Sequence, residues 1–192
     1  MTRVKICGLM RDADIDAVNA CLPDFAGFVF APSRRRVTID RAATLSARLD
    51  TRIVPVGVFV DAAINEIAEI AERGVIRIAQ LHGGESEDYI AELRRRADIP
   101  IIKAFRGGEA TETRADYVLL DGVNPGSGAA LDWSAIAPPT VPWFLAGGLQ
   151  PENVRDATTT LNPYAVDVSS GVETDSAKDF GKIRKFIDEV RR

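Results

Sequence analysis

Two patterns of apolar residues alternate along the chain. Short runs rich in β-branched and aromatic residues are followed by longer segments in which apolar residues recur at helical spacing. Segment 61–73 illustrates the helical pattern, with apolar residues at 64, 67, 68 and 71. The short runs predict strands over 4–6, 26–30, 53–59, 77–81, 101–105, 117–120, 143–145 and 165–168. The longer segments predict helices over 12–21, 40–49, 61–73, 85–97, 152–161 and 177–190.

This alternation predicts an α/β protein built from parallel βαβ units. The count of eight strands favours a single-domain (β/α)8 TIM barrel over residues 1–192, rather than an open doubly wound sheet. Such barrels usually have about 200 residues or more, whereas this chain has 192. The stretches after strands five and six, 106–116 and 132–137, are too short for a full helix, so we expect abbreviated crossovers there.

The composition is typical of a globular protein, with 46% apolar residues, 27% charged residues and a net charge of −4. Nucleic-acid-binding proteins usually have a basic face, and the main basic cluster here is the arginine run 34–36. No early segment is typical of a secretion signal, and no stretch approaches the roughly 18 apolar residues of a membrane span. We therefore expect a cytoplasmic protein without nucleic-acid or membrane partners, in which Cys7 and Cys21 stay reduced.

Polar residues follow almost every predicted strand. Because the carboxyl ends of barrel strands meet at one face, where the active sites of this fold lie, these residues define a candidate site. They are Cys7, Ser33, the arginines 34–36, Asp61, His82, Arg106, Asp121, Gly147, Gly148, Ser169, Ser170 and Gly171.

Glycine and serine pairs follow strands seven and eight, in "FLAGGLQPENV" (144–154) and "VDVSSGVE" (166–173). In this fold the loops after these two strands commonly bind phosphate, and glycine allows backbone N–H groups to approach an anion closely. Tight turns alone would also explain these glycines. Two such loops at adjacent strands favour a phosphorylated substrate.

The period of two along a strand predicts which side chains point into the barrel. It selects Lys5 and Cys7 on strand one, Asp121 at the end of strand six and Asp167 on strand eight. A phosphate at strands seven and eight would then lie between Asp121 and Cys7, which suits acid–base catalysis on a phosphorylated sugar. Lys5 could lower the pKa of Cys7 by favouring the thiolate. On spacing alone, Cys7 could also be a small core residue and Asp121 a turn former before Gly122.

Several short motifs follow one another along nearly the whole chain. They are KICG (5–8), GFVF (27–30), VGVFV (56–60), QLHG (80–83), LLD (119–121), GSG (126–128), LDW (131–133), AGGLQPENV (146–154) and AVDVSSGVE (165–173). In this order they resemble the phosphoribosylanthranilate isomerase family of tryptophan biosynthesis. Three departures from the family pattern are Pro125 in a shortened loop, LDW in place of the more usual Phe-Asp-Trp, and Gln150 where asparagine often caps a helix, glutamine being the poorer cap.

The resemblance implies an intramolecular aldose–ketose isomerase that performs an Amadori rearrangement. N-(5-phosphoribosyl)anthranilate would open its ribose ring, lose the C2′ proton and become 1-(2-carboxyphenylamino)-1-deoxyribulose 5-phosphate. The family's roles of general base and general acid fall on Cys7 and Asp121. No metal or organic cofactor is implied, because the nitrogen of the substrate serves as the electron sink.

The resemblance also implies substrate-binding residues. Arg35 matches the arginine that faces the anthranilate carboxylate, a group that suits the fork of a guanidinium. The loop is one residue shorter than usual, so Arg34 or Arg36 could take this role, and a solvated charge run is the alternative.

The remaining matches concern the sugar and the phosphate. Asp167 is expected at the sugar hydroxyls and His82, the single histidine, in a supporting role at the substrate. The phosphate loops match Gly147, Gly148, Ser170 and Gly171.

Three other functions share parts of this pattern. A metal-dependent pentulose-phosphate epimerase needs several histidines, and this chain has one. The related aminoaldose-phosphate isomerase of histidine biosynthesis uses two aspartates, whereas Cys7 occupies the strand-one position. A catalytically silent phosphate-binding barrel stays open on sequence alone. We expect a monomer whose partner is a small phosphorylated sugar–anthranilate substrate.

Overall fold

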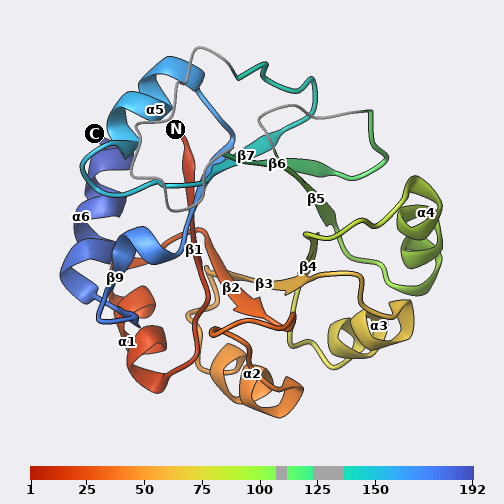
Figure 1. Cartoon of the computed structure of the whole chain (residues 1–192). Helices are drawn as coiled ribbons and strands as arrows, with labels where there is room; N and C mark the ends of the chain where they lie inside the picture. Colours follow the sequence, from red (N-terminus) through yellow and green to blue (C-terminus); the bar gives the residue numbers. More distant parts are fainter. Residues whose placement is uncertain (107–111, 123–135) are drawn as a thin grey trace.

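The computed structural model describes residues 1–106, 112–122 and 136–192 (Figure 1). Eight strands, each parallel to its neighbours, close into a barrel in chain order, which confirms the predicted fold. Pairing of the last strand with the first closes the ring and sets Lys5 opposite Asp167. The strands are β1 (Arg3–Cys7), β2 (Phe25–Val29), β3 (Val54–Phe59), β4 (Ile78–Leu81), β5 (Ile101–Arg106), β6 (Tyr117–Asp121), β7 (Trp143–Ala146) and β8 (Ala165–Val168).

Helices surround this ring of strands (Figure 1). Thr38, Ser86 and Asp179 cap three of them, because each side chain accepts a hydrogen bond from a backbone N–H in the first turn. The helices are α1 (Asp12–Cys21), α2 (Ile39–Ser46), α3 (Ile64–Glu72), α4 (Glu87–Arg96), α5 (Val154–Leu161) and α6 (Phe180–Arg191). Within the described residues, no helix is long and apolar enough to cross a membrane.

Among the residues that the structure describes, no helix lies between β5 and β6 or between β6 and β7. Parts of the two expected abbreviated crossovers, 107–111 and 132–135, lie outside the described residues. The motifs GSG and LDW and the departure at Pro125 lie outside them too.

The predicted strands end within one residue of the observed ones, but several helices begin later than expected. The helix expected from residue 61 begins at Ile64, because Asp61 adopts a left-handed backbone conformation with φ of 49°. The helix expected from residue 177 begins at Phe180. Residues Ala177–Lys178 instead form β10, which pairs antiparallel with β9 (Glu173–Thr174).

The core has two layers that follow the strand period of two. Phe25, Val56, Leu119 and Phe144 belong to the cluster that fills the barrel interior. The alternate residues pack with the helices, among them Val4, Ile6, Val118, Leu120, Val166 and Val168. The predicted inward and outward faces of β1, β6 and β8 are therefore observed.

The first strand and the last helix meet at Asp24, in the turn between α1 and β2. Its carboxylate accepts a hydrogen bond from the backbone N–H of Val4 at 2.9 Å. The guanidinium of Arg191, at the end of α6, lies 3.7 Å from the same carboxylate oxygen. One side chain thus touches both β1 and α6.

Candidate active site

A cavity of about 450 Å³ lies at the carboxyl ends of the strands. Every residue that the sequence assigns to catalysis, substrate or phosphate lines it. These residues are Cys7, Arg35, His82, Asp121, Gly147, Gly148, Asp167, Ser170 and Gly171. The ring closure explains the convergence, because it brings the loops after β1, β6, β7 and β8 to one face.

Cys7 is the last residue of β1, and its side chain is buried. Gly27 lies opposite it on β2. A Cβ atom at Gly27 would lie 2.8 Å from the Cys7 Sγ, so glycine leaves the room that the thiol occupies. The neighbouring strand therefore fixes the thiol at the edge of the cavity.

Lys5 and Asp167 form an ion pair inside the barrel. The Lys5 Nζ lies 2.9 Å from Asp167 Oδ2, and the lysine side chain is fully buried. Burial alone would lower the pKa of Lys5, but the charges of Asp167 and Cys7 outweigh it and the net pKa is raised. Asp167 Oδ1 is buried and has no hydrogen-bond partner among the described residues. This oxygen is available to accept a hydrogen bond from a ligand hydroxyl.

The pKa of Cys7 is raised overall, although Lys5 lowers it as expected. Burial has the largest effect, because a thiolate loses its hydration inside the protein. Lys5 and Lys178 do lower the pKa of Cys7, but their contributions do not offset burial. Spacing along β1 cannot reveal this balance, because it depends on how deeply the strand end is covered.

Asp121 lies at the end of β6 and faces His82, which follows β4. The His82 Nε2 lies 3.4 Å from Asp121 Oδ2. On the other side of the ring, Gln80 Nε2 lies 2.9 Å from His82 Nδ1. With the Gln80 amide donating there, the imidazole carries its proton on Nε2 and can donate it toward Asp121. His82 therefore lies between Gln80 and Asp121 at the wall of the cavity.

Two turns after β7 and β8 pack against each other. Gly147 and Gly148 have φ of 92° and 65°, conformations that favour glycine. A Cβ atom at Gly147 would lie 2.9 Å from Asp121 Oδ1, and one at Gly171 would lie 1.9 Å from the Leu149 carbonyl oxygen. These glycines therefore permit close backbone packing where a phosphate site is expected.

Asn153 fastens the turn after β7. Its side chain accepts a hydrogen bond from the Gln150 N–H at 2.9 Å and donates one to the Gly148 carbonyl at 3.0 Å. The helix expected from residue 152 begins at Val154, with Asn153 at its N-cap position. Gln150 is therefore not the N-cap residue of α5, because Asn153, three residues later, occupies that position.

The three arginines after β2 have different surroundings. Arg35 lines the cavity. Arg34 donates to Ser176 and Glu173 at the outer edge. Arg36 is exposed and borders a separate cavity beside α2. Of the three candidates, Arg35 is the one that lines the cavity at the ends of the strands.

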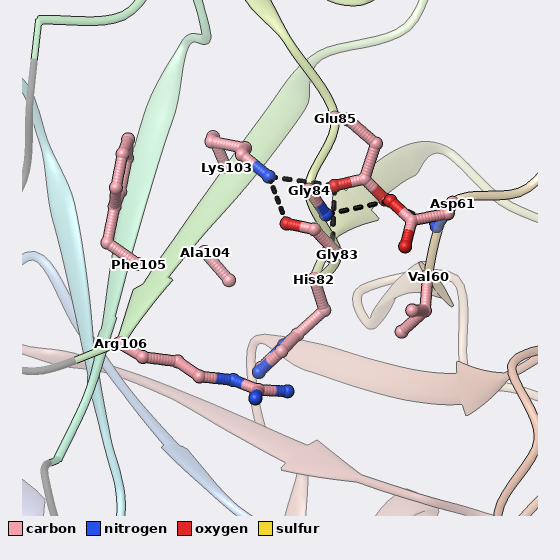
Figure 2. A pocket seen from close by; sticks show the side chains of 10 residues that line it. All are labelled: Val60, Asp61, His82, Gly83, Gly84, Glu85, Lys103, Ala104, Phe105 and Arg106. Atoms are coloured by element: carbon pink, nitrogen blue, oxygen red, sulfur yellow. Dashed lines mark hydrogen bonds and ion pairs between the residues drawn. The ribbon is translucent and has the colours of Figure 1, made fainter.

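A second cavity, of about 490 Å³, adjoins the first at Val60 and His82. Figure 2 shows Glu85 next to it, where its carboxylate accepts hydrogen bonds from the backbone N–H groups of Asp61 and Gly83, each at 2.9 Å. Lys103 Nζ donates to Glu85 and to the Gly83 carbonyl, each at 2.7 Å. This buried ion pair fastens the loops after β3 and β4 and so supports the backbone next to His82.

Sequence reasoning missed four polar residues close to the site: Gln80, Lys103, Glu173 and Lys178. Alternation along β4 could have pointed to Gln80, because it precedes His82 by two residues on the same face. Glu173 and Lys178 gave no such signal, because their side chains meet only through the β9–β10 hairpin. Within the described ranges, no group of three or more histidine, cysteine, aspartate or glutamate side chains could hold a metal ion.

Known proteins resemble this chain over its full length. A family model described as N-(5'phosphoribosyl)anthranilate (PRA) isomerase matches residues 4–189. The N-(5'-phosphoribosyl)anthranilate isomerase of Endomicrobium trichonymphae is 42% identical over 198 residues, covering 100% of this chain and 99% of the relative.

Solved structures agree with these matches. The phosphoribosyl anthranilate isomerase from Thermotoga maritima is 36% identical with a TM-score of 0.90, covering 100% of this chain and 99% of that one. A crystal structure of phosphoribosyl anthranilate isomerase in complex with reduced 1-(o-carboxyphenylamino)-1-deoxyribulose 5-phosphate is 32% identical, with a TM-score of 0.82. The match covers 100% of this chain and 99% of that chain.

Proposed function

Because this chain belongs to the N-(5'-phosphoribosyl)anthranilate isomerase family and is an isomerase of tryptophan biosynthesis, we propose that Cys7 is its general base and Asp121 its general acid. The reaction is the Amadori rearrangement of N-(5'-phosphoribosyl)anthranilate to 1-(2-carboxyphenylamino)-1-deoxyribulose 5-phosphate. One observation carries these roles: Cys7 and Asp121 line a single cavity together with the turns after β7 and β8.

In the proposed mechanism, Asp121 donates a proton to the ring oxygen of the ribose as the C1′–O bond breaks. The substrate nitrogen supplies the electron pair, and a Schiff base forms. The Cys7 thiolate then removes the C2′ proton, and the electrons of that C–H bond move into the Schiff base to give an enolamine. Ketonisation at C2′, with a proton added at C1′, yields the product. His82 orients the Asp121 carboxyl group by the polar contact of 3.4 Å between Nε2 and Oδ2.

The cavity supports a binding mode for each part of the substrate. Glycine-containing turns with Gly147, Gly148, Ser170 and Gly171 suit the phosphate. Two buried oxygens, Asp167 Oδ1 and Gln80 Oε1, have no hydrogen-bond donor within the described part of the chain. They suit sugar hydroxyl donors, because a buried acceptor without a donor is costly. Arg35 suits the anthranilate carboxylate.

We further propose that residues 1–192 form one barrel domain that acts as a cytoplasmic monomer, with no nucleic-acid or membrane partner. The pairing of β8 with β1 supports one domain, and a biosynthetic family supports the location. Sedimentation at micromolar concentration should give the mass of one chain. A mass of two chains would contradict the monomer.

The decisive experiment measures turnover of freshly prepared N-(5'-phosphoribosyl)anthranilate by the metal-stripped protein, alongside Cys7→Ser and Asp121→Asn. We expect the parent to be active and each variant to lose about a hundredfold or more in kcat, the scale of general acid–base catalysis. A parent that binds the substrate without converting it would support a silent barrel instead. A Cys7→Ser variant that stays active would contradict the assignment of Cys7 as the general base.

A further inference from the structure

Four charged side chains form a cluster between the loop after β2 and the β9–β10 hairpin, and the mechanism above does not use three of them. Glu173 is its centre, with a side chain only 6% exposed. One carboxylate oxygen accepts hydrogen bonds from Lys178 Nζ and Arg35 Nε, each at 2.7 Å. The other accepts from Arg35 Nη2 at 2.8 Å and Arg34 Nη2 at 3.0 Å. Each oxygen of Glu173 therefore receives two donors.

The geometry at Arg35 leaves one edge of its guanidinium free of Glu173. A guanidinium has five N–H donors in a rigid planar fork. Glu173 binds the side edge, formed by Nε and Nη2. The end edge, formed by Nη1 and Nη2, has the spacing to bind a second carboxylate with two parallel hydrogen bonds. The two carboxylates would thus bind Arg35 at the same time.

The stem of Arg35 is also held in place. It crosses Gly8 so closely that a Cβ atom there would lie 2.4 Å from the Arg35 Cδ. Gly8 has φ of 82°, which favours glycine on backbone grounds as well. Cys7 is the residue before Gly8, and both Cys7 and Arg35 line the cavity.

Lys178 also holds Glu173 in position. Its ammonium group, with a side chain 1% exposed, also donates to the Ser169 carbonyl at 2.9 Å and to Ser169 Oγ at 3.3 Å. Ser169 Oγ in turn donates to the Cys7 carbonyl at 3.0 Å. The hairpin, the end of β8 and the end of β1 are therefore joined through one lysine.

The cluster carries an excess of positive charge. Its three cations, Arg34, Arg35 and Lys178, face the single carboxylate of Glu173. The hydrogen bonds from Arg35 and Lys178 outweigh the effect of burial and hold the pKa of Glu173 at about 2, so the carboxylate is ionised at neutral pH. An anionic group entering the cavity at Arg35 would reduce the remaining excess.

We propose that Glu173 and Lys178 are positioning residues that hold Arg35 by its side edge, so that its end edge binds the carboxylate of the substrate. This assignment rests on the proposed function, which supplies a substrate with an aromatic carboxylate. Neither residue touches the reacting atoms. Their shared effect is on the part of the substrate that carries the carboxylate, whereas Lys178 also favours the thiolate of Cys7.

Two substrates that differ only in this carboxylate test the assignment. Ribose 5-phosphate condensed with anthranilate gives the natural substrate, and condensed with aniline it gives the analogue without the carboxylate. The variants are Glu173→Gln and Lys178→Met. The control is Glu152→Gln, which breaks an exposed Glu–Lys pair with Lys185 on the outside of the barrel. Thermal unfolding of each protein identifies variants that fail to fold.

For the anthranilate substrate, we expect KM of both variants to rise about tenfold, since a charge-assisted pair is loosened. The kcat of Glu173→Gln should stay within about threefold, whereas that of Lys178→Met should fall further because the thiolate of Cys7 loses a favourable charge. For the aniline analogue, kcat/KM of Glu173→Gln should equal that of the parent within about twofold. Lys178→Met should lose about tenfold less in kcat/KM on the analogue than on the anthranilate substrate. The Glu152→Gln control should match the parent on both substrates.

Equal losses on both substrates would overturn the assignment, because the cluster would then act only on the shape of the site. Unchanged kinetics on both would overturn it too. A parent protein that does not convert the anthranilate substrate would contradict the proposed function itself. The positioning role would then be contradicted as well, because it depends on that substrate.

Discussion

The Cys7 thiol lies between two opposing electrostatic effects. Lys5 and Lys178 favour its thiolate, while burial disfavours any charge at this position, and burial has the larger effect on its pKa. The inward direction of Cys7, Asp121 and Asp167 could be predicted from sequence, because a strand has a strict period of two. The protonation of Cys7 could not, because it depends on the depth at which the fold covers the strand end.

The pH dependence of thiol alkylation should report this balance. A raised pKa means that the Cys7 thiolate becomes abundant only above the ordinary thiol range. We therefore expect the rate of Cys7 alkylation by iodoacetamide to rise about tenfold per pH unit between about pH 7 and 8.5, as the thiolate fraction grows. An alkylation rate that levels off within this range would contradict the expectation.

Gly171 offers a second test at the scale of one residue. In Gly171→Ala the new methyl group would overlap the Leu149 carbonyl, which is backbone and cannot rotate away. We expect the free energy of unfolding to fall by about 1–3 kcal/mol, as for an overpacked site, with weaker binding of inorganic phosphate. Urea unfolding and phosphate inhibition measure the two effects.

Gly84→Ala is the matched control for Gly171→Ala. A methyl group at Gly84 would meet its nearest neighbour, Asp61 Oδ1, at an ordinary 3.7 Å. Its free energy of unfolding should stay close to that of the parent. An equal loss of stability in both variants would show that overlap with Leu149 is not the cause.

At the scale of elements, the β9–β10 hairpin is the feature that the sequence pattern conceals. Strands of two residues are too short to show alternation, and Ala177 fits the apolar period of the following helix. The connecting residues Asp175 and Ser176 have φ of 49° and 64°, as a tight hairpin turn with a two-residue loop requires. They lack the Asn-Gly sequence that is typical of such a turn, so the hairpin could not be predicted from the sequence.

The turn of this hairpin should be open to stabilisation. Ser176→Gly removes the side chain that disfavours a positive φ, so we expect the free energy of unfolding to rise by about 1 kcal/mol. Ser176→Ala keeps the unfavourable conformation and loses the same hydroxyl contact with Arg34, which makes it the control. Denaturant unfolding of both variants separates backbone relief from loss of the hydrogen bond. A glycine variant no more stable than the alanine variant would contradict the idea.

At the scale of the whole molecule, the fold was the most predictable property. Eight strands separated by helical segments left few alternatives to a closed parallel barrel, and closure requires β8 to pair with β1. The ion pairs that hold the loops over the barrel could not be predicted. Glu85 and Lys103 are 18 residues apart, and Arg35 and Glu173 are 138 residues apart, so no local pattern relates them.

The stability of the molecule in acid should depend on Glu173. Its pKa in the folded protein is about 2, below its ordinary value of 4.5, because Arg35 and Lys178 donate to it against the effect of burial. Its ionised form therefore stabilises the fold above about pH 4.5, and this contribution is lost as pH falls toward 2.

Urea unfolding of the parent and of Glu173→Gln at several pH values measures this contribution. The parent should be the more stable at pH 7, and the difference should shrink as the pH falls from 4.5 toward 2. A difference that stays constant down to the lowest pH would mean that the Glu173 carboxylate does not titrate with folding.

The contacts of Asp24 have a consequence for the order of the chain. Because this one side chain touches both β1 and α6, the two ends of the described chain lie beside the same turn. A short peptide linker could therefore join them, and a new opening could be made in an exposed turn elsewhere on the ring. Such a circularly permuted protein would contain the same barrel, read from a different starting point.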